Sequence, residues 1–200
     1  AIGHARGVHS GLVALGELER RRRRPEQAKV LFREALEGAR TAGNRGLEAS
    51  GRLRLSAVFR DTGEVAPALE EARRALELSR GEGARLAEAE ALFAVGDAAM
   101  LQGRPEAALE DFVSGERLLE GLGEPDIAWR LTHGQGRALE ALGRDAEAVE
   151  ACRRAVGYVE TVRGRLREER FRAGYIEERH RPYVDLVRLL LRLGRDDEAF

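Results

Sequence analysis

Small residues recur along this chain at a fixed interval of 40 positions, and no other feature restricts its possible folds as strongly. Three columns consist of alanine, glycine or serine: Ala28, Ala68, Ala108 and Ala148; Ala35, Ala75, Gly115 and Ala155; and Gly16, Ser56, Gly96 and Gly136. A fourth column places Gly63, Gly103 and Gly143 at a turn, with Arg23 as the exception in the first repeat. Self-similarity at a fixed period of tens of residues is the signature of a repeat array.

Each repeat unit is predicted to contain two amphipathic helices. Apolar residues of the second helix follow the i, i+3, i+4, i+7 spacing of a helix face, as in Ala28, Leu31, Phe32, Ala35 and Leu36. Pro25 and Pro105 stand where such a helix begins, and the turn glycines stand where the preceding helix ends. No segment shows the sustained alternation of a strand. We therefore predict an all-α fold, a right-handed α-solenoid of stacked antiparallel helix pairs.

The small columns have a packing reason, because two helices approach closely only where their side chains are short. A bulky residue there would cost roughly 1–3 kcal/mol. Larger residues are expected to fill the spaces between helices. They recur as Leu15, Leu55 and Val95 on the first helices, and as Phe32, Phe112 and Cys152 on the second helices.

The spacing Gly-(x11)-Ala-(x6)-Ala, with a turn glycine five residues before the first alanine, resembles the tetratricopeptide repeat (TPR). The usual unit has about 34 residues, and the longer unit here is similar to the long-helix variants of kinesin-light-chain-like and bacterial signalling arrays. The resemblance implies one solenoid domain over residues 1–200. Its repeats would span about 9–48, 49–88, 89–128 and 129–179, with a partial fifth repeat at 180–200.

The fourth interval is longer than the others, because Ala148 and Ala199 are 51 residues apart, 11 more than the period. Eleven residues make close to three helical turns, so a continuous helix would keep its facing phase. We expect either a long, partly exposed helix or a helix with a joint near Gly174. Pro182 would then mark the first turn of the next helix.

Residues from about 160 to 200 carry a second resemblance, to the junction that follows the last repeats in bacterial CHAT-domain proteins. There a caspase-like protease module follows the array. The resemblance rests on Leu166, Arg167, Phe171, Tyr175, Tyr183, Leu190, Gly194 and Ala199. Pro182 departs from the continuous helix expected at such a junction. The resemblance implies that any protease residues would lie beyond Phe200.

Charge and composition argue against several classes of partner. The 34 basic residues balance 35 acidic ones, which leaves no basic field to attract nucleic acid or an anionic membrane. The longest nearly apolar stretch, residues 91–101, is too short to span a bilayer, and no secretory leader opens the chain. We expect a soluble, cytoplasmic protein that binds neither nucleic acid nor membrane.

Reactive side chains do not converge on a catalytic site. Cys152 is the only cysteine, and its place in a core column predicts a buried apolar role. The four histidines form no metal-binding pair, and the glycine-rich segment 134–139 is expected within a helix. We therefore expect no catalytic residue, no cofactor and no metal, and do not expect an enzyme.

A run of arginines, Arg20 to Arg24, closes the first helix. It is typical of a solvated helix end, where cations interact well with the helix dipole. The alternative is a patch for an anion or an acidic peptide, because arginine binds carboxylate and phosphate groups well.

The expected binding surface is the concave face of the array, which the first helix of each repeat lines in such folds. Counting from the small column gives these groove candidates: Arg54, Glu90, Phe93, Asp97, Met100, Arg130, His133 and Arg137. Such a surface would suit an extended or helical peptide with apolar and acidic side chains. The lysine and asparagine pattern of repeats that bind chaperone tails is absent.

These observations favour a protein-interaction module, either the sensor or scaffold segment of a larger bacterial signalling protein or the regulatory arm of a CHAT-type protease. A free-standing adaptor is the alternative. It would self-associate as a homodimer through an unpaired C-terminal end, where Leu189, Leu190 and Leu193 are expected to be exposed.

Overall fold

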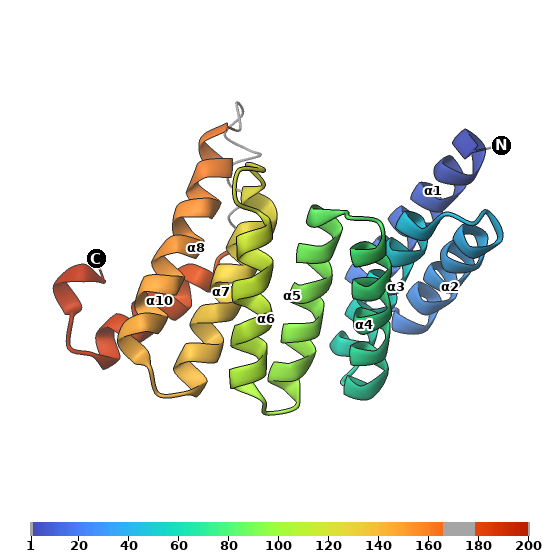
Figure 1. The fold of residues 1–200 in the computed structure, drawn as a ribbon. Coiled ribbons are helices and arrows are strands. Elements are labelled where there is room, and N and C mark those ends of the chain that lie inside the picture. Colours follow the sequence, from blue (N-terminus) through green and yellow to red (C-terminus); the bar gives the residue numbers. More distant parts are fainter. Residues whose placement is uncertain (1, 166–178, 200) are drawn as a thin grey trace. The chain divides into compact units, whose positions relative to one another are not determined.

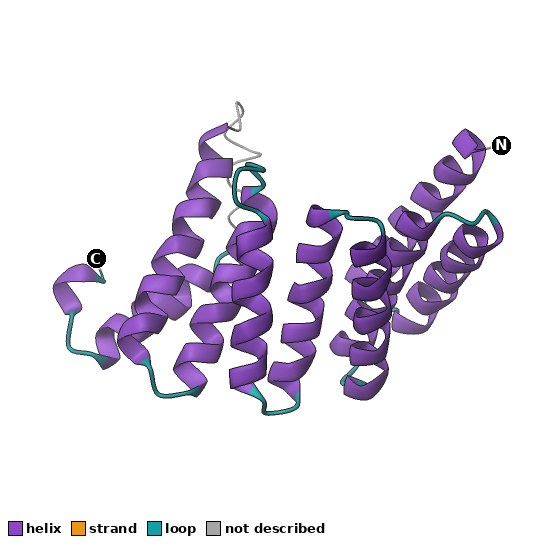
Figure 2. Cartoon of the chain, viewed as in Figure 1, coloured by secondary structure: helices purple, strands orange, loops and turns teal. Residues whose placement is uncertain are grey.

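A computed structural model describes residues 2–165 and 179–199. Its described residues form nine α-helices and one 3₁₀ turn, with no strand among them (Figure 2). The helices are α1 (Ile2–Arg21), α2 (Pro25–Thr41), α3 (Arg45–Asp61), α4 (Val65–Gly81), α5 (Arg85–Leu101), α6 (Pro105–Leu118), α7 (Pro125–Ala141), α8 (Asp145–Arg165) and α10 (Arg181–Arg192); the 3₁₀ turn is η1 (Asp196–Glu198). The predicted all-α solenoid of helix pairs is confirmed.

The chain divides into two compact units, Ala1–Gln102 and Gly103–Phe200. In the first unit α1 packs on α2, α3 packs on α2 and α4, and α5 packs on α4 (Figure 1). In the second unit α7 packs on α6 and α8, and α10 packs on α8. The division falls in the turn that joins α5 to α6, within the third predicted repeat. A single continuous domain over residues 1–200 stays a prediction.

The turns between helices have the geometry that the glycine column predicts. Gly63 and Gly143 adopt φ values of 77° and 73°, in the left-handed region that glycine enters without steric cost. Arg23 adopts a φ of 58° at the same position of the first repeat, where a side chain is strained. Pro25 and Pro105 begin α2 and α6, as predicted.

The small columns lie where paired helices come closest. Ala28, Ala68, Ala108 and Ala148 are fully buried. A β-carbon at Gly16 would collide with the ring of Phe32, and one at Gly136 would lie 2.7 Å from Sγ of Cys152. Close packing of α1 on α2 and of α7 on α8 therefore requires these short residues, as the sequence predicted.

The prediction for Leu15 is wrong. Leu55 and Val95 are buried, whereas the equivalent Leu15 is 53% exposed. The physical reason is position in the array: Leu55 and Val95 lie on α3 and α5, which the preceding helices α2 and α4 cover. No described helix covers the same side of α1.

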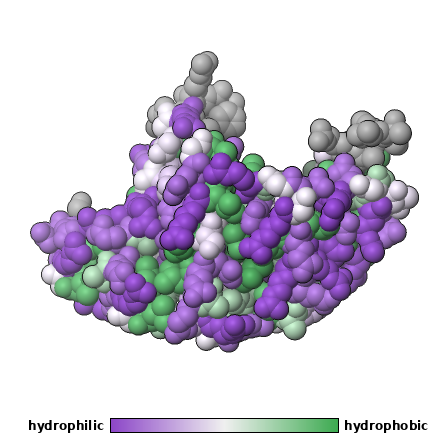
Figure 3. Space-filling view, viewed as in Figure 1, coloured by the Kyte–Doolittle hydropathy of each residue, from purple (hydrophilic) through white to green (hydrophobic). Residues whose placement is uncertain are grey.

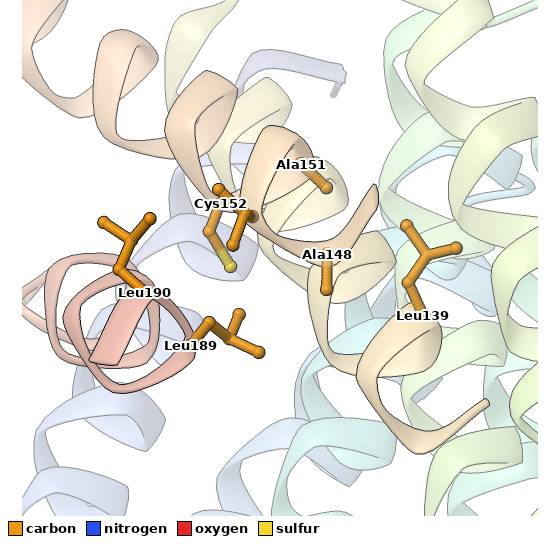
Figure 4. Packing of buried hydrophobic residues seen from close by; sticks show 7 residues of the cluster. Leu139, Ala148, Ala151, Cys152, Leu189 and Leu190 are labelled. Atoms are coloured by element: carbon orange, nitrogen blue, oxygen red, sulfur yellow. The ribbon is translucent and has the colours of Figure 1, made fainter. Parts of the chain in front are cut away.

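The prediction for the C-terminal leucines is wrong at two of its three positions. Leu189 and Leu190 are buried against Ala148 and Cys152 of α8 (Figure 4), while Leu193 is 39% exposed as expected. The leucines turn toward the preceding helix pair, so they do not depend on a further helix for burial.

The longer fourth interval begins as a helical extension. Left-handed glycines separate the earlier repeats at positions 43, 83 and 123, but α8 continues through position 163 and ends at Arg165. Pro182 lies in the first turn of α10, as predicted. The possible joint at Gly174, and Leu166, Arg167, Phe171 and Tyr175 of the CHAT resemblance, lie outside the described residues.

Candidate functional site

Five of the eight predicted groove residues lie together on two first helices of the first unit. Arg54 belongs to α3, and α5 carries the other four at helical spacing: Glu90, Phe93, Asp97 and Met100. We call these five residues the α3–α5 surface. Four of them are half-buried, whereas Asp97 is only 6% exposed.

Ion pairs join neighbouring first helices along this surface. A guanidinium nitrogen of Arg54 lies 3.3 Å from the carboxylate of Glu17 on α1. Arg60 on α3 lies 3.0 Å from the carboxylate of Asp97 on α5. Two of the predicted residues, Arg54 and Asp97, therefore help to hold neighbouring first helices together.

Burial and charge act in opposite directions on Arg60. Desolvation lowers the pKa of its guanidinium, but the charges of Asp97 and Asp61 outweigh this effect and raise it. Asp97 is thus occupied by a partner inside the protein. The accessible side chains of the surface include Phe93 and Met100, which are half-buried, and Arg54, whose side chain is 40% exposed.

The other three predicted residues, Arg130, His133 and Arg137, lie on α7 in the second unit. His133 is 7% exposed, and its Nε2–H donates to the carboxylate of Asp185 on α10 at 2.7 Å. That hydrogen bond, with a further one from Arg188, lowers the pKa of Asp185 to about 2. His133 thus helps to dock α10 on α7.

In a second contact between α7 and α10, the acidic residue lies on α7 and the basic residues lie on α10. Glu140 on α7 pairs with Arg188, and with Arg192 at 3.0 Å. The hydrogen bond from Arg188 is the main reason that the pKa of Glu140 is lowered. Asp185 and Arg188 were not among the predicted residues. The 51-residue interval carries a signal for them, because it maps α7 onto α10 and places Arg188 at the position of Arg137.

Two pockets lie away from the predicted residues. One of about 620 Å³ lies between the α6–α7 turn and the extended end of α8, with Glu120, Glu124 and Pro125 facing Tyr158 and Arg165. The other, of about 550 Å³, lies between α1 and α2; Val8, His9, Leu12, Ala35, Gly38 and Thr41 line it. Most of the surface visible in Figure 3 is hydrophilic, with smaller apolar patches.

Cys152 is 1% exposed, as the core column predicted. Burial raises the pKa of its thiol to about 12, with a further contribution from the charges of Asp185 and Glu140. The thiol is therefore protonated near neutral pH and is a poor nucleophile there.

Within residues 2–165 and 179–199, no three His, Cys, Asp or Glu residues gather as a metal site, and no helix is long and apolar enough to cross a membrane.

Comparisons with known proteins show the fold. No protein-family model matches the sequence, and no curated protein shows significant similarity to it. The structure resembles aspartyl phosphate phosphatase F from Bacillus subtilis, with a TM-score of 0.74 and 15% identity over 98% of this chain and 49% of the other. It resembles kinesin light chain TPR-like repeats from Podosopora anserina, with a TM-score of 0.67 and 17% identity over 98% of this chain and 90% of the other.

A third similar structure is the Rap conjugation gene regulator of the plasmid pLS20, which was solved in complex with a Phr peptide. Its TM-score is 0.73, with 14% identity over 94% of this chain and 49% of the other. The chain spans about half the length of the first structures that it matches. The TPR-type fold is confirmed, while the CHAT junction stays a prediction.

Proposed function

We propose that this chain is a protein-interaction module that binds a peptide or peptide-like segment on the α3–α5 surface. The observation that carries the proposal is the pair Phe93 and Met100, seven residues apart on one face of α5 and both half-buried. Arg54 lies on the neighbouring helix, and its side chain is 40% exposed beside Glu17, so its guanidinium remains within reach of an acidic partner. Apolar contacts beside a charged donor suit a peptide with apolar and acidic side chains.

Preformed shape supports recognition as the mechanism. The first helices are already joined by ion pairs before any partner binds, so the entropy lost on ordering the surface is small. The Rap regulator with its Phr peptide offers a precedent for peptide binding by a similar fold. Arg130 and Arg137 on α7, beside Trp129 with its unpartnered indole N–H, are the second candidate surface.

The wider role that we propose is the sensor or scaffold segment of a larger bacterial signalling protein. The regulatory arm of a CHAT-type protease is a narrower form of the same proposal. In either role we propose that the chain acts by recognition rather than by catalysis.

The test begins with peptides selected from a randomised displayed library on the immobilised full chain. Each selected peptide is then titrated by fluorescence anisotropy against the wild type and against Phe93→Ser. We expect binding to weaken about tenfold or more, because truncating a central apolar contact removes a large share of binding energy. Val30→Ser is the matched control, since Val30 is 61% exposed on α2. Equal affinity for Phe93→Ser and wild type would rule out this surface.

A free-standing adaptor that forms homodimers is the second candidate function. Val184 and Leu191, seven residues apart on α10, are 55% and 46% exposed, and these replace the buried Leu189 and Leu190 as candidate contacts. Sedimentation of the wild type and of Leu191→Glu tests it. A dimer that Leu191→Glu dissociates would support this function, and a wild-type monomer at high concentration would exclude it.

A further inference from the structure

Helix α1 presents an apolar face that no described part of the chain covers. Val8, Leu15 and Leu18 are 49%, 53% and 42% exposed, and their spacing of seven and three residues places them on one side of the helix. Gly11 lies between them on the same side. We call these four residues the α1 face.

The repeats supply an internal control for this face. The residues 40 positions after Leu15 and Leu18 are Leu55 and Val58, which are 3% and 0% exposed because α2 packs over them. In α5 the counterparts Val95 and Ala98 are buried in the same way under α4. The α1 face is therefore the same helix-binding face, without a helix upon it in the described structure.

Glycine at position 11 supports this interpretation. A β-carbon on its counterpart, Gly51, would lie 3.3 Å from Cα and Cβ of Leu36 on α2, so glycine there permits a close approach between helices. A β-carbon on Gly11 would meet nothing within 4 Å. Glycine weakens a helix relative to alanine, and nothing inside the described structure requires it at position 11.

Charge marks one end of the α1 face. The arginine run that closes α1 has no counterpart in the α3–α4 turn, where Asp61 and Glu64 occupy equivalent positions. Arg22 and Arg24 both pair with the single carboxylate of Glu19, and their side chains remain 54% and 58% exposed. Two guanidinium groups therefore share one carboxylate, which leaves a net positive charge beside the C-terminal end of the α1 face.

We propose that the α1 face binds an amphipathic helix of another protein, one with a leucine–alanine stripe and acidic residues in its first turn. The stripe follows from α2, which covers α3 with Leu36 and Ala39. The acidic first turn follows from the direction in which a covering helix runs. The start of α2 lies beside the end of α3, where Lys29 and Glu64 pair at 2.6 Å. A helix bound to α1 in the same way places its N-terminus beside the arginines. Acidic residues are favoured in its first turn both by the helix dipole and by the positive charge of these arginines.

One contact would differ from those between repeats. Arg40 and Arg80 pair with Glu48 and Glu88 on the helices that follow them, but the equivalent position on α1 is Val8. The bound helix therefore has an apolar residue where α2 and α4 have arginine. Val8 also lines the pocket between α1 and α2, so an apolar side chain there has space to enter.

The probe is a synthetic, fluorescently labelled peptide of residues 25–41 with the change Arg40→Leu, which has the stripe and Glu26 in its first turn. It is titrated against the full chain, against Gly11→Leu and against the control Val30→Ser. We expect saturable binding to the wild type and the control, and affinity about tenfold weaker for Gly11→Leu, because the side chain blocks close approach. Gly11→Leu should melt no lower than wild type, since leucine favours a helix more than glycine does.

Arg24→Glu adds an electrostatic test. We expect it to weaken binding of the same peptide, and to make the remaining affinity less dependent on salt. Absence of binding to the wild type, or equal affinity for Gly11→Leu, would overturn the proposal. A wild-type dimer that Gly11→Leu dissociates in sedimentation would overturn it too, because the occupant would then be a second copy. Phe93→Ser leaves the expected result unchanged, so this proposal and that for the α3–α5 surface fail independently.

Discussion

Within each unit an ion pair joins two neighbouring first helices at the same two repeat positions, but the charges at those positions are opposite in the two units. In the first unit Glu17 pairs with Arg54, and Arg60 pairs with Asp97. In the second unit Glu140, at the repeat position of Arg60, pairs with Arg188, at the repeat position of Asp97, so the acid and the base are exchanged. His133 also pairs with Asp185, but it stands four residues before the position equivalent to Glu17. The repeat thus determines which positions meet, and leaves open which partner is the acid.

The exchange of charges has a consequence for specificity. If α10 packed on α1 in the place of α3, Asp185 would face Glu17, and like charges would repel. Opposite polarity therefore helps each first helix to select its own neighbour, since discrimination between similar surfaces commonly depends on unfavourable alternatives. What the units share is the set of small, buried columns, and what distinguishes them is the sign of the charges that join their first helices.

The largest expected effect concerns the shared columns. Ala68→Arg in the first unit and Ala108→Arg in the second each place a long charged side chain at a fully buried position. We expect each to lower the free energy of unfolding by about 3 kcal/mol or more. Thermal melts followed by circular dichroism measure this, and an unchanged melt for Ala108→Arg would contradict the assigned packing.

Exchanging the charges of Arg60 and Asp97 tests whether the first unit tolerates the polarity found in the second unit. Arg60→Glu leaves the buried Asp97 facing a like charge, and should cost about 2 kcal/mol, less than a fully buried pair because Arg60 is partly exposed. Adding Asp97→Arg restores the pair with the polarity of the second unit, and should recover most of the loss. A double-mutant cycle by urea unfolding gives the coupling energy. If the double variant is no more stable than Arg60→Glu, the pairing has no role in stacking.

Acid should loosen the second unit at α10. Because the pKa of Asp185 is about 2 in the folded chain and about 3.9 in an unfolded one, the carboxylate stabilises the fold above about pH 4. That stabilisation is lost as the pH falls toward 2. Fluorescence of Trp129, the only tryptophan, reports the change because its ring lies 6.4 Å from that of His133. Asp185→Asn should remove this transition, and its persistence in that variant would assign it to another group.

The smallest expected effect lies at the turn column. Arg23→Gly should stabilise the chain by about 1 kcal/mol, because it removes a side chain from the left-handed region. Gly63→Arg makes the converse change in the next repeat and should destabilise by a similar amount. Equal melting temperatures for the two variants would show that backbone strain at this position has no measurable weight.

The sequence predicted the repeat, the helix pairs and the buried small columns, because these depend on local periodicity and on volume. It failed for Leu15 and for Leu189, since their burial depends on which helix happens to lie beside them. The spacing placed five groove candidates on α3 and α5, where their binding role stays a prediction, but it did not show that Asp97 is already paired with Arg60. The partner of a charged residue in a neighbouring repeat depends on tertiary contacts that spacing within one helix does not encode.

Hydrogen–deuterium exchange of the full chain, with and without a peptide selected on it, tests the central claim most directly. Binding on the α3–α5 surface predicts protection within residues 50–60 and 90–101, with little change in the α1 face. Protection confined to other helices, or none at saturating peptide, would contradict the assignment of the binding surface.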